Sequence, residues 1–163
     1  MQRTPHLPLL VLPVLAALLL AAPLAADGLR LAPIKDPVVA KECSACHMLY
    51  PAGLLPARSW STIMADLANH FGDNAELDAA TTRHITEYLA ANAADSTKQN
   101  HVVLRGLAPT EAPARITALP WWTRKHERRD RVAPATLARA GAKFKGDCKA
   151  CHQDAERGIF DDD

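Results

Sequence analysis

Apolar residues recur at every third or fourth position in the middle of the chain, which is the period of a helix with one buried face. The apolar positions of this stretch are Trp60, Ile63, Met64, Leu67 and Phe71. Ser59 precedes them and Gly72 follows them, and these residue types are typical of a helix N-cap and of the turn that ends a helix. The pattern therefore predicts a helix from Trp60 to about Phe71.

Three further helices are predicted from shorter signals. Asp36 followed by Pro37 has the sequence of a helix start. Asp78 precedes another periodic stretch, residues 79–93, and residues 134–145 form the last candidate. We find no signal for a strand anywhere in the chain. The expected fold class is therefore all-α, with much loop.

The first 26 residues have the features of a secretory signal. Arg3 supplies a positive charge, residues 7–22 are almost wholly apolar, and Leu24-Ala25-Ala26 offers a cleavage site before Asp27. A retained membrane anchor is the alternative, but prolines interrupt the apolar run. We therefore predict a cleaved signal over residues 1–26 and a periplasmic protein.

Two short motifs contain all four cysteines of the chain. They are Cys43-Ser44-Ala45-Cys46-His47 and Cys148-Lys149-Ala150-Cys151-His152. C-x-x-C-H is the attachment signal of c-type haem, in which two thiols bond to one porphyrin and the histidine binds the iron. The motifs thus predict two covalently bound haem c groups, attached through Cys43, Cys46, Cys148 and Cys151, with His47 and His152 as the proximal ligands.

Other uses of paired cysteines fit the sequence less well. A zinc site would place the two C-x-x-C pairs closer together in the chain. A thioredoxin-like redox pair would come with a βαβ pattern, which is not visible, and a disulfide framework is the third competing use. Covalent haem attachment also agrees with the predicted export of the chain.

Charge and length limit the other possibilities. Removal of Arg3 with the signal lowers the number of Lys and Arg residues from 19 to 18, which equals the 18 Asp and Glu residues, so the exported chain would be neutral. Haem propionates would make it acidic, which argues against nucleic acid or an anionic membrane surface as a partner. The length suits two very small units. We predict two cytochrome c-like haem domains, residues 27–95 and residues 96–163, the latter including a connecting segment, residues 96–114.

The sixth ligand of each iron decides the class of function. A second histidine gives a low-spin, low-potential iron, a methionine raises the potential, and an open position allows ligand binding or catalysis. His70 ends the predicted middle helix and has room to enter the first haem crevice. His126 precedes the second motif by enough chain to fold back over that haem. We predict His70 and His126 as the distal ligands.

Other residues remain candidates for the sixth position. His84, in the predicted helix over residues 79–93, is the reserve for the first haem, and His101 in the connecting segment could reach either iron. Met64 lies on the apolar face of its helix and is expected to be a core residue. Met48 follows His47 directly and cannot reach the opposite face of the same haem.

Several segments resemble the small dihaem cytochromes c of bacterial periplasms. They are Cys43 to Met48, Leu54-Leu55-Pro56-Ala57-Arg58-Ser59-Trp60, Asp66 to Gly72, Ala75-Glu76-Leu77, Arg115-Ile116-Thr117, Pro120-Trp121-Trp122, Lys125-His126 and Cys148 to His152. The resemblance covers nearly all of the chain after the signal. It implies two haem domains with bis-histidine iron, electron transfer, and two partners, a membrane cytochrome b and a small oxygen-binding monohaem cytochrome c.

The leading interpretation is thus a periplasmic electron carrier with two bis-histidine haems and no catalytic residues of its own. A haem enzyme or ligand-binding protein, peroxidase-like and with one open iron site, is the alternative, and it requires acid or base groups above that iron. A haem-based sensor is a third class, but the sequence contains no signalling or DNA-binding segment.

Overall fold

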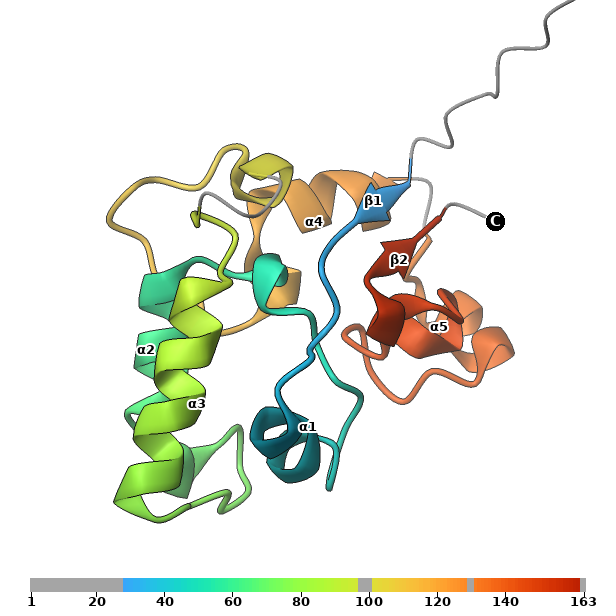
Figure 1. Ribbon diagram of the computed structural model, residues 1–163. Coiled ribbons are helices and arrows are strands. Elements are labelled where there is room, and N and C mark those ends of the chain that lie inside the picture. Colours follow the sequence, from blue (N-terminus) through green and yellow to red (C-terminus); the bar gives the residue numbers. More distant parts are fainter. Residues whose placement is uncertain (1–27, 97–100, 129–130, 162–163) are drawn as a thin grey trace, which may run out of the picture.

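The computed structural model describes residues 28–96, 101–128 and 131–161, so the predicted signal, residues 1–26, lies outside the described residues. The helices are α1 (Pro37–Cys43), α2 (Ala57–Met64), α3 (Ala79–Ala91), α4 (Pro120–His126) and α5 (Pro134–Ala140). Short 3-10 turns and loops join them, and α2 packs side by side with α3 (Figure 1). Within the described ranges, no helix is both long enough and apolar enough to cross a membrane. The predicted all-α class is confirmed, apart from one very small sheet.

That sheet corrects the expectation that the chain contains no strands. Strand β1 (Leu29–Arg30) pairs antiparallel with strand β2 (Ile159–Phe160). The backbone of Gly158 approaches the N-terminal strand closely, because the Leu31 amide donates to its carbonyl at 2.8 Å. Gly158 has φ 77°, and a Cβ there would lie 2.0 Å from the Leu31 carbonyl oxygen, so only glycine fits. Two-residue strands are too short to show an alternating pattern in the sequence.

The starts of α1 and α3 are as predicted. The Asp36 carboxylate accepts hydrogen bonds from the Val38 and Val39 amides at 2.9 and 3.0 Å. Asp78 does the same for the Ala80 and Thr81 amides. These contacts satisfy amides that have no partner within the helix. Each cap is local in sequence, which is why the residue types alone identified it.

The predicted bounds of α2 are wrong at both ends. The helix begins at Ala57 after Pro56, so Ser59 lies inside it instead of capping it. It ends at Met64, and the chain continues into a separate 3-10 turn, η2 (Leu67–Asn69). A side-chain hydrogen bond of 2.7 Å from Asn69 to Asp66 stabilises this turn, because such polar side chains compete with helical backbone bonding.

Helix α5 also ends earlier than predicted. It stops at Ala140 because Gly141 adopts the left-handed conformation at φ 69°, which is a common way for a helix to end. The chain then runs through a loop to the second C-x-x-C-H motif, whose cysteine pair spans the 3-10 turn η6 (Cys148–Ala150). A further turn, η7 (Ala155–Arg157), precedes β2.

The main core contains residues from both halves of the chain. Its buried members include Val39, Leu55, Trp60, Ile85, Leu89, Leu119 and Trp122. A second cluster joins β1 to the 3-10 turns η1 (Ala52–Leu54) and η3 (His101–Leu104) through Leu29, Leu31, Leu54, Ala94 and Val103. The division into two haem domains stays a prediction. The described contacts show that the halves share packed apolar residues.

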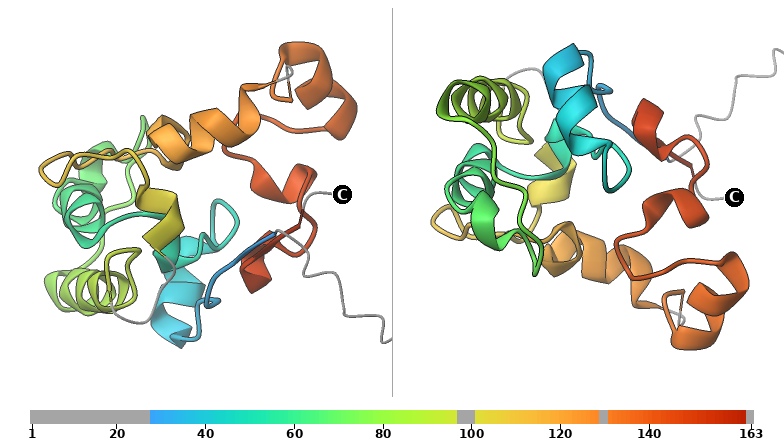
Figure 2. Two further views of the ribbon diagram at one scale, coloured as in Figure 1. Left: turned by 90° about the horizontal axis from the view of Figure 1, so that it is seen from above. Right: turned by 90° about the horizontal axis from the view of Figure 1, so that it is seen from below.

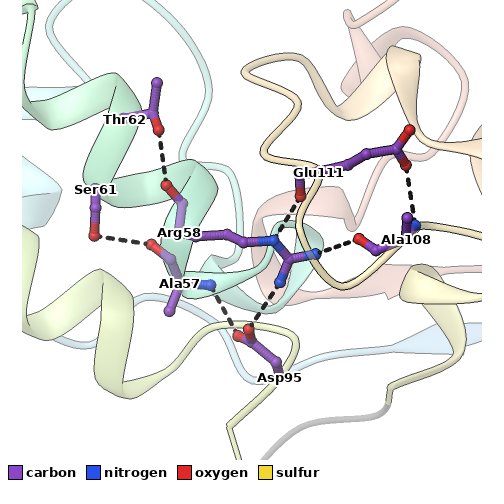
Figure 3. A network of polar contacts seen from close by, with 7 residues as sticks. All are labelled: Ala57, Arg58, Ser61, Thr62, Asp95, Ala108 and Glu111. Carbon is purple, nitrogen blue, oxygen red and sulfur yellow. Dashed lines mark hydrogen bonds and ion pairs between the residues drawn. The ribbon is translucent and has the colours of Figure 1, made fainter.

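Arg58 fixes the connecting segment against α2. Its guanidinium donates to the Ala108 carbonyl at 3.2 Å and to the Glu111 carbonyl, and it pairs with the Asp95 carboxylate at 3.4 Å (Figure 3). Asp95 also accepts from the Ala57 amide at 2.8 Å. One arginine thus ties the start of α2 to the chain that leads into the second half of the protein. The 3-10 turn η4 (Ile116–Ala118) and α4 follow that segment.

Acid is expected to weaken the start of α1. Hydrogen bonding from the Val39 amide, followed by the contact with His84, holds the pKa of Asp36 below its ordinary value of 3.8. A carboxyl group with a lowered pKa in the folded state stabilises the fold at neutral pH, and this contribution is lost as the pH falls through the folded-state pKa. We therefore expect the thermal midpoint to decrease when the pH is lowered below about 4.

Asp36→Asn tests this expectation because asparagine still caps a helix but does not titrate. The measurement is the thermal midpoint at pH 7 and pH 3 for the wild type and the variant. The variant should lose less stability between these two values. An equal loss in both proteins would assign the acid sensitivity to other carboxyl groups.

Candidate functional site

The first motif begins at the end of α1 and continues into a turn. Cys43 is the last residue of the helix and is half-buried, whereas Cys46 is exposed. His47 lies just beyond the turn, and its Nδ1 is 2.7 Å from the Met48 carbonyl oxygen. Because a carbonyl can only accept, Nδ1 carries the proton and the Nε2 lone pair is available to a metal.

The second motif forms a tighter turn. The His152 amide donates to the Cys148 carbonyl at 2.7 Å, so the histidine folds back over the cysteine pair. Burial raises the pKa of the Cys148 thiol to about 11, while Cys151 is exposed. His152 Nδ1 lies 3.1 Å from the Asp161 carbonyl oxygen, next to β2. The small terminal sheet therefore orients this histidine, with the same Nε2 left available.

A sharp change of direction brings His70 to His47. The two ring centres are 6.2 Å apart and the ring planes differ by 26°. After η2, Phe71 adopts φ 57° and Gly72 φ 111°. A positive φ is unusual for a bulky residue and is typically found where function demands it. The Arg115 guanidinium lies 4.3 Å from the centre of the Phe71 ring and supports this turn through a cation–π contact.

The local environment of His70 favours its neutral form. Burial lowers the pKa of His70, and the neighbouring His47 lowers it further, while Asp73 acts in the opposite sense. A neutral imidazole keeps a lone pair for a metal. The ring also contacts Phe71, with 4.8 Å between ring centres.

Helix α4 presents His126 to His152. The ring centres of these histidines are also 6.2 Å apart, with an angle of 84° between their planes. His126 is the last residue of α4. Its ring stacks on the Trp122 ring, with 4.3 Å between ring centres and 9° between ring planes. Its Nδ1 is 3.0 Å from the Trp122 carbonyl oxygen. One buried tryptophan therefore orients the histidine through both its ring and its backbone.

The separation of each pair suits a single metal ion. A histidine nitrogen lies about 2 Å from a bound metal and the ring centre about 1 Å further, so two histidines on opposite sides of one ion have centres about 6 Å apart. Both observed separations, 6.2 Å, agree with this value. The structure thus pairs His47 with His70 and His126 with His152, and each pair stands beside its C-x-x-C cysteines.

A cavity of about 520 Å³ opens at the second pair, within the range of about 300–1,000 Å³ for small-molecule and cofactor sites. Both histidines and both cysteines of the second site line it. Its other lining residues are mostly apolar or basic, and include Leu29, Leu54, Ile116, Trp121, Val132, Leu137, Phe160, Lys125, Arg131 and Lys145. Apolar walls fit the porphyrin ring and basic side chains fit its propionates. The donor set, the histidine separation and the cavity therefore all fit a haem.

The other candidate ligands lie elsewhere. His84 is paired with Asp36, with 2.9 Å between Nε2 and the carboxylate, and His101 is an exposed residue of η3. Met64 is buried in the main core, as its place in the apolar pattern predicted.

Sequence reasoning missed Phe160 and Leu29, which shape the second site. Phe160 lies against His152, with 5.7 Å between ring centres, and Leu29 reaches the second cavity from the far end of the chain. At the first site, the Tyr50 ring lies against the His47 ring, with 5.1 Å between ring centres. Burial, with Cys148 and Asp147 nearby, raises the pKa of Tyr50 to about 12, so its hydroxyl stays a donor. The residue types of Phe160 and Leu29 gave no local signal for their roles.

Comparison with known proteins gives a consistent result. The family model for dihaem cytochrome c matches residues 39–160. A solved structure of a dihaem cytochrome c from Rhodobacter sphaeroides is 53% identical, with a TM-score of 0.70, covering 79% of this chain and 99% of that one. A dihaem cytochrome type c from Shewanella baltica is 38% identical, with a TM-score of 0.60, covering 77% of this chain and 86% of that one. Among curated proteins, no match was found.

Proposed function

The chain belongs to the dihaem cytochrome c family and carries two covalently bound haem c groups, and on this premise we propose that it transfers single electrons between redox partners with each iron held by two histidines. When bound, each haem supplies an iron that gains and loses one electron. The observation that carries the proposal is the equal separation of the two histidine pairs, 6.2 Å in both sites.

The backbone contacts of the histidines would set the properties of the iron. His47, His126 and His152 each direct Nδ1 toward a backbone carbonyl, at 2.7, 3.0 and 3.1 Å. Such a bond fixes the ring orientation and raises the basicity of the ligand. A more basic imidazole favours the oxidised iron, so these contacts favour low reduction potentials.

Apolar side chains around the histidines would exclude water. Trp122 is 3% exposed and covers one face of His126, while Phe160 lies against His152. Burial restricts the rearrangement of solvent when the charge at the iron changes, which suits repeated electron transfer without loss of a ligand.

One observation favours the alternative of an open iron, and it concerns the first site. His70 lies in a loop after η2, whereas His126 belongs to a helix. Among the described residues, no hydrogen bond holds the His70 ring. If either distal histidine were displaced by a ligand such as peroxide or cyanide, it would be His70.

The electronic spectrum and paramagnetic resonance of the oxidised, haem-containing protein test the proposal. We expect two low-spin signals and no charge-transfer band from a methionine–iron bond. A large high-spin component that binds cyanide would contradict bis-histidine ligation and favour the ligand-binding or peroxidase-like alternative.

Location and partners are part of the same proposal. The N-terminal sequence supports export to the periplasm, and the family resemblance supports exchange of electrons with a membrane cytochrome b and a small oxygen-binding monohaem cytochrome c. Stopped-flow mixing of the reduced protein with each oxidised partner measures this exchange. Rates no faster than those with an unrelated cytochrome would contradict the choice of partners.

A further inference from the structure

Tyr50 contacts both candidate iron sites, and we propose that it is a positioning residue that couples them. Its ring lies against the His47 ring, with 5.1 Å between centres. Its hydroxyl donates to the Gly146 carbonyl at 2.9 Å, and the same carbonyl accepts from the Cys148 backbone amide at 2.9 Å. A single side chain thus extends from the proximal histidine of the first site to an attachment cysteine of the second.

A neighbouring contact ties the same segment to the second motif. The Leu49 amide donates to one oxygen of the Glu156 carboxylate at 3.1 Å. The other oxygen of Glu156 pairs at 2.7 Å with Lys149, which lies inside the second C-x-x-C-H motif. The loop after α1 lies beside the C-terminal segment in both views of the fold (Figure 1, Figure 2). Residues 48–50 therefore form the junction between the two sites.

The junction also includes the hydrogen bond that orients His47. His47 Nδ1 is bonded to the carbonyl of Met48, and Met48 is two residues from Tyr50. A displacement of the junction therefore changes the strength of this bond, and with it the basicity of the proximal imidazole. The potential of the first site thus depends on a contact made at the second site. This coupling rests on the proposed role of His47 as an iron ligand.

The test compares the two tyrosines of the chain. Tyr50→Phe removes only the hydroxyl that reaches Gly146 and leaves the ring against His47. Tyr88→Phe is the matched control. Tyr88 lies on α3, and its hydroxyl accepts from the Lys35 amide at 3.0 Å, a contact that includes no residue of either motif. The two midpoint potentials of each protein are measured by a spectroelectrochemical titration.

We expect Tyr50→Phe to raise the potential of the first site and to leave both irons low-spin. The equilibrium constant for sharing one electron between the two sites should change about threefold. At 59 mV per tenfold change for one electron, this equals about 30 mV in the difference between the two midpoint potentials. Tyr88→Phe should keep the spacing of the wild type, that is, the difference between its two midpoint potentials. Glu156→Ala loosens the same junction from the surface and should shift the spacing in the same direction.

An unchanged spacing in Tyr50→Phe overturns the proposal, as does an equal change in Tyr88→Phe. If Tyr50→Phe does not mature with haem, the spacing in Glu156→Ala decides in its place. The spacing can be measured whatever the sixth ligands are. Failure of the bis-histidine proposal would appear in the spectrum of the unmodified protein, and failure of the junction would appear only in the variants.

Discussion

His126→Ala and His70→Ala should each convert one of the two haems from low spin to high spin while the other haem keeps its low-spin signal. His70 and His126, the proposed distal ligands, each face the histidine of a different motif, with 6.2 Å between ring centres. Alanine has no group that binds iron, so the sixth position is left to water or a substitute ligand. The measurement is paramagnetic resonance of the oxidised variants, together with cyanide binding.

Two other histidines provide the matched controls. His84 is engaged with Asp36 and His101 is exposed on η3, so His84→Ala and His101→Ala should keep both low-spin signals. Methionine gives a further check, because His126→Met should restore a sixth ligand and raise the potential of that haem. An unchanged low-spin spectrum in His70→Ala or His126→Ala would show that the affected pairing is wrong.

Among substitutions that leave both C-x-x-C-H motifs intact, Trp122→Ala should be the most destabilising. Trp122 is 3% exposed and belongs to the main core. Truncation of a buried tryptophan to alanine costs about 3–5 kcal/mol, against a total stability of about 5–15 kcal/mol for a typical domain. We therefore expect a large drop in the thermal midpoint of the holoprotein.

The same substitution should also disturb the second site, because the Trp122 ring stacks on His126. Trp60→Ala is the control for stability alone. Trp60 is 8% exposed in the same core, and its indole donates to the Ala52 carbonyl at 2.8 Å, without contact to His126. Both variants should be less stable, but only Trp122→Ala should alter the low-spin signal of the second haem. Equal spectra in the two variants would show that Trp122 does not orient His126. Trp122→Phe should recover most of the lost stability.

The starts of α1 and α3 and the haem attachment motifs could be predicted because they depend on neighbours in the sequence. Asp36 and Asp78 cap helices through amides two and three residues away. The two C-x-x-C-H motifs carry their chemistry in five consecutive residues. The spacing of apolar residues likewise placed Met64 in the core, where the structure has it.

The sequence by itself thus determined the helical class and the two haem attachment motifs, and it predicted the proximal histidines and the candidates for the distal ones. Only the tertiary structure decided which histidine faces which, because His70 reaches His47 through the early end of α2 and the turn at Phe71. The tertiary structure also decided the pairing of β1 with β2 and the contact of Tyr50 with Gly146. These contacts join residues far apart in the chain, and their free energy depends on how the whole core packs. No local pattern of residue types records them.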